Sequence, residues 1–190
     1  MNQPGQGIIM REQAKKMNNS LYRDLLDYSD QELIKTPQSS FMLLAKSQAL
    51  NEEKKFQEAI ELCQNVLREE PQHLHALYRK SYSLYDLAQY SQAISCVDVA
   101  LKYNPQYSIG YASIGVALYN LKKYDDAIIC YDKAIQIDPN YAEAYKYKGD
   151  LLKHIKKYSS AMENYQQAIK YCKSDENEFK RLIMELKNTK

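Results

Sequence analysis

The sequence predicts an all-α fold, an α–α solenoid of four helical hairpins that follow one another every 34 residues. The step is visible in alanine, at Ala59, Ala93, Ala127 and Ala161, and in proline, at Pro71, Pro105 and Pro139. A fixed period of about 20 to 50 residues is typical of stacked copies of one supersecondary unit. Apolar residues within each copy keep helical spacing, so each copy is expected to be a pair of helices.

The hairpin at 108–141 has the clearest pattern. The apolar face of its first helix, at i, i+3, i+4 and i+7 spacing, comprises Tyr111, Ile114, Gly115 and Leu118. After a break at 121–123 the same spacing returns in a second helix, at Tyr124, Ala127, Ile128, Tyr131, Ala134 and Ile135. Pro139 marks the end of this helix, because proline disfavours helical backbone in the residue before it.

The other hairpins, 40–73, 74–107 and 142–175, superimpose on this one without a gap. The second helix opens with an aromatic residue in each: Phe56, Tyr90, Tyr124 and Tyr158. The first helix carries a small residue in each: Ser47, Ser81, Gly115 and Gly149. We expect the small residue to face the recurrent alanine of the partner helix, which brings the two helices to the short end of the usual separation of about 8–10 Å.

These residues resemble the tetratricopeptide repeat family, over residues 40–175. The family pattern places a small residue between apolar positions in the first helix, then alanine, an aromatic residue, alanine and proline in the second. The family often has glycine between the two helices, and this chain departs from it there with Lys54, Ala88, Lys122 and Lys156. The resemblance implies a protein-binding solenoid.

The two ends of the chain need separate interpretation. Residues 176–190 place Phe179, Leu182, Ile183 and Leu186 in the register of a further first helix, which predicts the C-terminal capping helix of the family. Residues 1–39 are interpreted as an N-terminal arm with one amphipathic helix, marked by Leu21, Leu25, Leu26, Tyr28, Leu33 and Ile34. Residues 1–10 lack a periodic pattern and are expected to be loose.

Composition argues against several classes of partner. The net charge is +2 with acids and bases interspersed, which gives no electrostatic basis for binding nucleic acid. No apolar run approaches the ~20 residues that cross a bilayer, so membrane insertion is not expected. The N-terminus also lacks the apolar core of a signal peptide. We therefore expect an intracellular, cytoplasmic protein.

No catalytic, metal or cofactor site is predicted. The four cysteines, Cys63, Cys96, Cys130 and Cys172, form no CxxC pair, and three of them lie near one register of the second helices. Small buried apolar residues are the simplest interpretation of that placement. The histidines, His73, His75 and His154, have no cysteine at ligand spacing. The chain is accordingly predicted not to be an enzyme.

The resemblance implies a groove lined by the first helices. Carried over position by position, the candidate partner-binding residues are Tyr78, Arg79, Tyr82, Tyr85, Ser113, Tyr119, Asn120 and Tyr147. Tyrosine and arginine are over-represented among binding hot spots, since they bury a large area and keep a polar group. The alternative is that these tyrosines reflect composition alone, because the chain has 18 of them.

We therefore predict an adaptor or scaffold that binds a partner peptide or helix in this groove. The alternatives are a structural subunit of a large assembly, a chaperone cofactor, and a repeat domain of a larger enzyme. Family members that bind chaperone tails hold the terminal carboxylates with Lys, Asn and Arg side chains. With hairpins one to three in that role, the positions are Leu44, Gln48, Arg79, Ile109 and Ser113. A frame one repeat earlier gives Met10, Ala14, Ala45, His75 and Arg79, so this clamp is largely absent.

Overall fold

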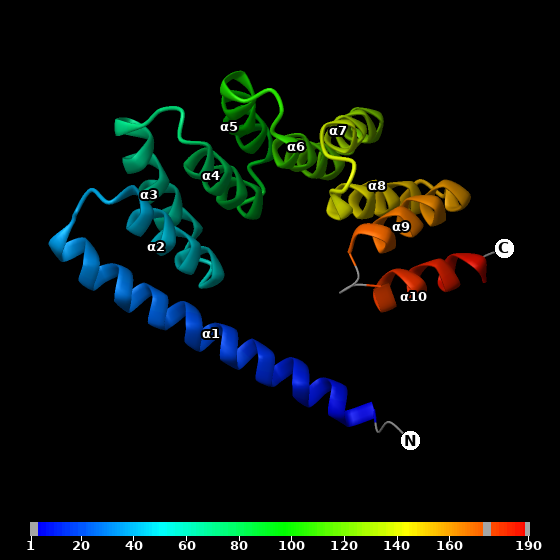
Figure 1. Ribbon diagram of the computed structural model, residues 1–190, viewed down its shortest axis with the longest axis horizontal. Helices are drawn as coiled ribbons and strands as arrows, with labels where there is room; N and C mark the ends of the chain where they lie inside the picture. Colours follow the sequence, from blue (N-terminus) through cyan, green and yellow to red (C-terminus); the bar gives the residue numbers. More distant parts are fainter. Residues whose placement is uncertain (1–3, 173–175, 189–190) are drawn as a thin grey trace. The chain divides into compact units, whose positions relative to one another are not determined.

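The computed structural model describes residues 4–172 and 176–188. Within these ranges the chain forms ten α-helices and no strand (Figure 1). The predicted all-α fold of helical hairpins is therefore confirmed. The chain divides into two compact units, unit 1 at residues 1–88 and unit 2 at residues 89–190.

The helices keep the period of the sequence. Unit 1 contains α1 (Pro4–Lys35), α2 (Ser40–Glu52), α3 (Phe56–Glu69) and α4 (Leu74–Asp86). Unit 2 contains α5 (Tyr90–Tyr103), α6 (Ser108–Asn120), α7 (Tyr124–Ile137), α8 (Ala142–His154), α9 (Tyr158–Tyr171) and α10 (Glu176–Lys187). The first helices α2, α4, α6 and α8 are each 13 residues long, and the second helices α3, α5, α7 and α9 are each 14.

In each hairpin, the second residue after the first helix has left-handed backbone. The φ values are 61° at Lys54, 58° at Ala88, 61° at Lys122 and 62° at Lys156. After α6, the N–H of Lys122 donates to the Tyr119 carbonyl at 2.9 Å and the N–H of Lys123 donates to the Leu118 carbonyl at 2.9 Å. This is a Schellman motif, which usually contains glycine because a Cβ disfavours this backbone conformation.

Unit 1 is held together by a core beneath consecutive helices. α1 packs on α2, α2 on α3, and α3 on α4. The buried cluster comprises Leu43 and Leu44 of α2, Cys63 and Val66 of α3, and Ala76 of α4. Leu33 of α1 packs against the same cluster. The C-terminal half of α1 is therefore a packed layer of the unit.

α1 corrects the expectation that residues 1–10 are loose, since the helix begins at Pro4; residues 1–3 lie outside the described part of the chain. Proline is well tolerated in the first turn of a helix, where its missing N–H needs no intrahelical partner. Extending an anchored helix adds one hydrogen bond for each residue fixed, whereas starting one is costly. An apolar stripe was therefore not needed for the helix to continue.

The C-terminal half of α1 also has the register of a second helix. Residues 22–35 stand 34 positions before α3, and α1 ends at Lys35 as α3 ends at Glu69. Pro37 likewise stands 34 positions before Pro71. Ser20 occupies the position of the left-handed Lys54, but its backbone remains helical. α1 is thus the second helix of an incomplete repeat, extended straight toward the N-terminus.

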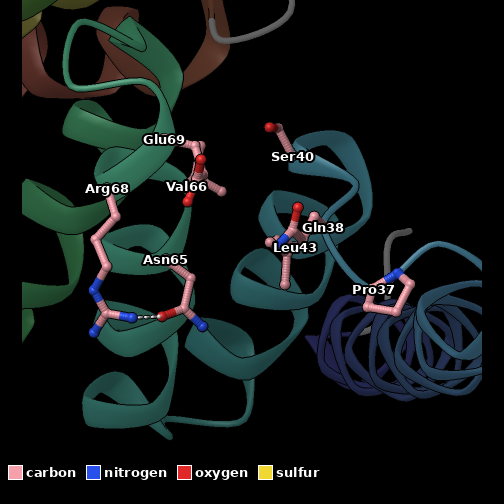
Figure 2. A pocket seen from close by; sticks show the side chains of 8 residues that line it. All are labelled: Pro37, Gln38, Ser40, Leu43, Asn65, Val66, Arg68 and Glu69. Atoms are coloured by element: carbon pink, nitrogen blue, oxygen red, sulfur yellow. Dashed lines mark hydrogen bonds between the residues drawn. The ribbon is translucent and has the colours of Figure 1, made fainter.

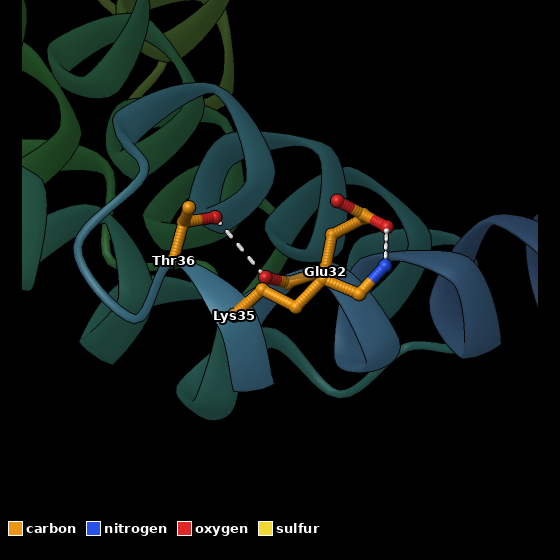
Figure 3. A network of polar contacts seen from close by, with 3 residues as sticks. All are labelled: Glu32, Lys35 and Thr36. Carbon is orange, nitrogen blue, oxygen red and sulfur yellow. Dashed lines mark hydrogen bonds and ion pairs between the residues drawn. The ribbon is translucent and has the colours of Figure 1, made fainter.

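Polar contacts close the end of α1 ahead of Pro37 (Figure 3). The Glu32 carbonyl accepts two hydrogen bonds from Thr36, one from the backbone N–H at 2.9 Å and one from the side-chain hydroxyl at 3.0 Å. The Lys35 ammonium pairs with the Glu32 carboxylate at 2.8 Å. The helix stops here because a proline two residues beyond its last residue cannot continue the hydrogen-bonding pattern.

Unit 2 is organised around two glycine–tyrosine contacts. A Cβ added at Gly115 would lie 2.5 Å from Cε1 of Tyr131, and one added at Gly149 would lie 2.7 Å from Cε1 of Tyr165. Both tyrosines are buried. In these two hairpins the ring of a tyrosine, four residues beyond the recurrent alanine on the second helix, lies directly against the small residue, and only glycine leaves room for it.

α10 covers the last hairpin. It packs on α9 through Phe179, Ile183 and Leu186, which join a buried cluster with Leu152 and Tyr165. The Phe179 and Tyr165 rings stack with centroids 6.2 Å apart. Without α10 this apolar surface of the last hairpin would be exposed to water.

Candidate functional site

In unit 1 the predicted groove residues lie on α4, beside α2. The Arg79 guanidinium donates to the Gln48 side-chain carbonyl at 2.7 Å, joining two first helices at positions that the family pattern assigns to the groove. Tyr82 is 45 % exposed, whereas Tyr78 and Tyr85 are half-buried. Phe41 of α2, at another groove position, is 74 % exposed. This face therefore combines exposed aromatic area with a fixed polar group.

In unit 2 the predicted residues lie on α6 and α8, and all are half-buried. The Ser113 hydroxyl donates to the Ile109 carbonyl, and the Asn120 amide donates to the Val116 carbonyl, both within α6. The ring of Tyr147 lies 6.0 Å from that of Tyr131 and packs on the core. Ser113 and Asn120 thus bond within their own helix, and Tyr147 contributes to the packed core.

Tyr119 belongs to an aromatic cluster that the sequence pattern did not predict. The rings of Tyr119, Tyr124 and His154, from α6, α7 and α8, have centroids 5.3 to 5.7 Å apart. The Tyr124 hydroxyl and Nε2 of His154 are 3.1 Å apart, within hydrogen-bonding distance. The sequence signal that could have predicted this contact is the spacing of Tyr124 and His154, which are 30 residues apart, four fewer than the 34-residue repeat. The contact joins consecutive hairpins at the ends where their first helices stop.

Groove positions of the last hairpin contact α10 and α9. Lys146 pairs with Glu178 and Lys153 with Glu185, both at 3.6 Å. The Tyr165 hydroxyl donates to the Asp150 carboxylate at 2.7 Å. Burial raises the pKa of the Asp150 carboxyl, and it raises the pKa of Tyr165 as well. These groups stabilise the packing of the last three helices.

The cysteines are poor candidates for chemistry. Cys63 and Cys96 are buried, as predicted, and Cys130 and Cys172 are half-buried. Burial raises the pKa of the Cys63 thiol, and burial with nearby Asp126 and Asp98 raises that of Cys130 to about 11. The thiolate is the reactive form of cysteine, and a raised pKa lowers the thiolate fraction of both groups near neutral pH.

Beyond the predicted groove, the described residues form hollows but no cluster of metal ligands. None of their His, Cys, Asp and Glu side chains gather in groups of three or more that could hold a metal ion. None of the helices over these ranges has the length and apolar character to span a membrane. A hollow of about 230 Å³ lies between the start of α2 and the end of α3, floored by Leu43 and Val66 (Figure 2). Two further hollows, of about 390 Å³ at residues 36–39 and about 310 Å³ beside Tyr22 and Lys55, lie at the low end of the ~300–1,000 Å³ of typical small-molecule sites.

Three sequence profiles of the tetratricopeptide repeat family match the chain, at residues 50–114, 108–141 and 130–170. Together they cover more than half of it, in the register of the observed helices. The chain belongs to the tetratricopeptide repeat family. No curated protein matches this tetratricopeptide repeat chain in a sequence search.

Solved structures show the same fold. TTC0263 from Thermus thermophilus, a thermophilic tetratricopeptide repeat protein, aligns with a TM-score of 0.78 and 16% identity over 90% of this chain and 96% of its own. MamA from Desulfovibrio magneticus RS-1 aligns with a TM-score of 0.64 and 21% identity, over 82% of this chain and 96% of its own. YrrB is described as a tetratricopeptide repeat protein with an unusual peptide-binding site. It aligns with a TM-score of 0.61 and 18% identity, over 92% of this chain and 88% of its own. At these identities the likeness concerns the fold.

Proposed function

We propose that this protein is a non-enzymatic interaction adaptor that holds a peptide or helix of a partner protein against its first helices. Tetratricopeptide repeat proteins are in general scaffolds without enzymatic activity. The unusual peptide-binding site described for YrrB adds to this expectation. The partner is a protein rather than a nucleic acid, and the adaptor works inside the cell without a membrane span.

The observation that carries the proposal is the face of α4 in unit 1. Tyr82 is 45 % exposed there, in the same helix as Arg79, whose guanidinium is fixed by Gln48 of α2. An ordered arginine beside exposed tyrosine loses little side-chain entropy when a ligand binds. Such residues are frequent hot spots, whose truncation typically costs about 2 kcal/mol or more of binding free energy.

The test compares two exposed tyrosines. Partners captured by affinity purification of the intact protein are identified by mass spectrometry, and their affinity is then measured by titration. Tyr82→Ala should weaken binding about tenfold or more while leaving the unfolding temperature nearly unchanged. Tyr103→Ala is the matched control, because Tyr103 is 53 % exposed but lies on a second helix.

The opposite pattern of affinities would contradict binding at the first helices. If Tyr103→Ala weakens binding and Tyr82→Ala does not, the partner contacts the second helices, and the structural-subunit alternative is favoured. Tyr119 is a less suitable position, because its ring packs on Tyr124 and His154 and its truncation would also change stability.

The chaperone-tail alternative is disfavoured by α1. The frame that keeps His75 and Arg79 requires a complete repeat at residues 6–39, with a turn near Ser20. α1 is instead one continuous helix from Pro4 to Lys35. The separate first helix that should supply two of the five clamp positions is therefore missing, and terminal carboxylates would retain only Arg79 and, in part, His75 as charge-assisted donors.

A further inference from the structure

Four lysines of unit 2 stand at two neighbouring hairpin turns, where backbone geometry favours other residues. We call Lys122, Lys123, Lys156 and Lys157 the lysine edge. Lys122 and Lys156 have left-handed backbone, with φ of 61° and 62°, which glycine adopts at less cost. Lys123 and Lys157 are the N-caps of α7 and α9, and neither makes a side-chain capping hydrogen bond.

An N-cap lysine is doubly unfavourable. Ser, Thr, Asp or Asn at this position would accept a hydrogen bond from a free backbone N–H, which lysine cannot do. Its positive charge also lies next to the positive end of the helix dipole. Residues that break local folding preferences are expected at functional sites. The same cationic side chain at four such positions therefore points to a use outside the fold.

The lysine edge is exposed and its charges are not neutralised within unit 2. All four residues are exposed, and none of the described acidic groups forms an ion pair with them. By contrast, Lys55 at the equivalent turn of unit 1 pairs with Glu53 at 2.7 Å. Asp125 and Asp126, in the first turn of α7, offset the charge only in part, since the corresponding residues of α9 are serines.

The two turns are fixed relative to each other by the aromatic cluster. Tyr124 directly follows Lys123, and His154 lies two residues before Lys156. The contact of 3.1 Å between the Tyr124 hydroxyl and Nε2 of His154 therefore joins the two pairs of lysines. α6 and α8 also pack on each other, and the axes of packed helices usually lie about 8–10 Å apart.

We propose that the lysine edge binds an extended acidic segment of a partner protein, at a site separate from the first-helix face. An extended chain advances about 3.3 Å per residue, so acidic side chains three residues apart match the two turns. Flexible, hydrated ammonium groups suit carboxylates presented along a segment. Binding is electrostatic and weakens as salt is added.

The test uses the intact protein and a labelled peptide of about twelve residues with an acidic residue at every third position, long enough to span about 40 Å. Its C-terminus is amidated, so that no terminal carboxylate takes part. Fluorescence anisotropy in about 50 mM salt should show saturable binding that weakens about tenfold in about 300 mM salt. Lys156→Gly with Lys157→Ser should lower the affinity about tenfold, and adding Lys122→Gly with Lys123→Ser should abolish binding.

These substitutions suit the backbone, so the variants should unfold at or above the temperature of the parent protein. Lys102→Gln with Lys170→Gln is the matched control: it removes the same charge from the last turns of α5 and α9, at the opposite ends of the hairpins. It should change the affinity less than twofold, and so should Tyr82→Ala on α4. The proposal is overturned if the parent protein does not bind the peptide, or if the control loses as much affinity. Tighter binding of a single-stranded RNA of equal charge, lost with the same variants, would also overturn it in favour of a nucleic acid.

Discussion

At the scale of single residues, the hairpin turns store strain that glycine would relieve. A side chain in left-handed backbone costs about 1–2 kcal/mol of stability. Glycine removes this cost, but it also makes the unfolded chain more flexible, which offsets roughly half of the gain. Lys54, Ala88, Lys122 and Lys156 all have φ near 60°. The position was recognisable from the sequence as the place where the family often has glycine, but the left-handed backbone itself was visible only in the structure.

Lys122→Gly should raise the free energy of unfolding by about 0.5–1 kcal/mol, because relief of the backbone strain exceeds the entropy lost. Urea denaturation followed by circular dichroism measures this. Lys123→Gly is the control, since Lys123 has φ of −89° and gains nothing from glycine. Equal stabilisation by both substitutions would show that removal of charge, and not backbone relief, is the cause.

The glycine–tyrosine contacts show where spacing alone was insufficient. Periodicity indicates which residues share the buried face of a helix, and Gly115 was correctly placed there. It does not indicate which of two residues on the facing helix fills the gap, Ala127 or Tyr131. In the first hairpin, Ser47 lies within hydrogen-bonding reach of Cys63, the residue at the Tyr131 position. A larger first-helix residue is thus matched by a smaller one opposite.

Gly115→Ala should destabilise the protein by about 1–2 kcal/mol, since the added Cβ would overlap Tyr131 and this outweighs the better helix propensity of alanine. A double-mutant cycle gives the sharper measurement. Gly115→Ser together with Tyr131→Cys reproduces the Ser47–Cys63 pair of the first hairpin. The two changes should show a favourable coupling of about 1 kcal/mol, and additive effects would contradict the contact.

At the scale of the helices, α10 was predictable because it repeats the apolar register of a first helix. Its contacts follow from that register: Phe179, Ile183 and Leu186 are buried against α9. α1 was predicted less well. Its last 14 residues are followed by the turn-forming Pro37, as in the other repeats, but the position of the recurrent alanine is occupied by Leu25. The missing alanine concealed the incomplete repeat.

Phe179→Ala should lower the free energy of unfolding by about 3–4 kcal/mol, through lost burial and the cavity left beside Tyr165. Thermal unfolding measured by circular dichroism tests this. Met184→Ala, on the exposed side of the same helix, should change stability by less than about 0.5 kcal/mol. Similar losses in both variants would mean that helix formation, rather than packing on α9, supports this end.

At the scale of the whole molecule, repeat proteins behave approximately as a sum of local stabilities and nearest-neighbour contacts. The first-helix residues show the limit of what sequence predicts at this scale. The family pattern identified the positions, but it could not show that Tyr147 packs on the core while Tyr82 remains exposed. The exposure of a side chain depends on how its neighbours fill the space around it, and the position of a residue within the repeat does not determine this.

Hydrogen exchange should resolve the two compact units. Gly115→Ala lies in unit 2, so it should reduce amide protection in α6 to α9 by about tenfold and in α2 and α3 by much less. Mass spectrometry of peptides from the exchanged protein provides the measurement, with the parent protein as reference. A uniform loss across both units would indicate a single cooperative unfolding transition.

The incomplete repeat in α1 has a consequence for how the array changes length. α2 packs on the end of α1 as α4 packs on α3, and Ser29 of α1 is fully buried like Cys63 of α3. A tandem duplication of residues 40–73 would thus place familiar surfaces on both sides of the new junction. A whole repeat inserted at the loop before Ser40 would therefore pack through surfaces that the protein already has. Failure of such a duplicated chain to fold would mean that α1 and α3 present different surfaces.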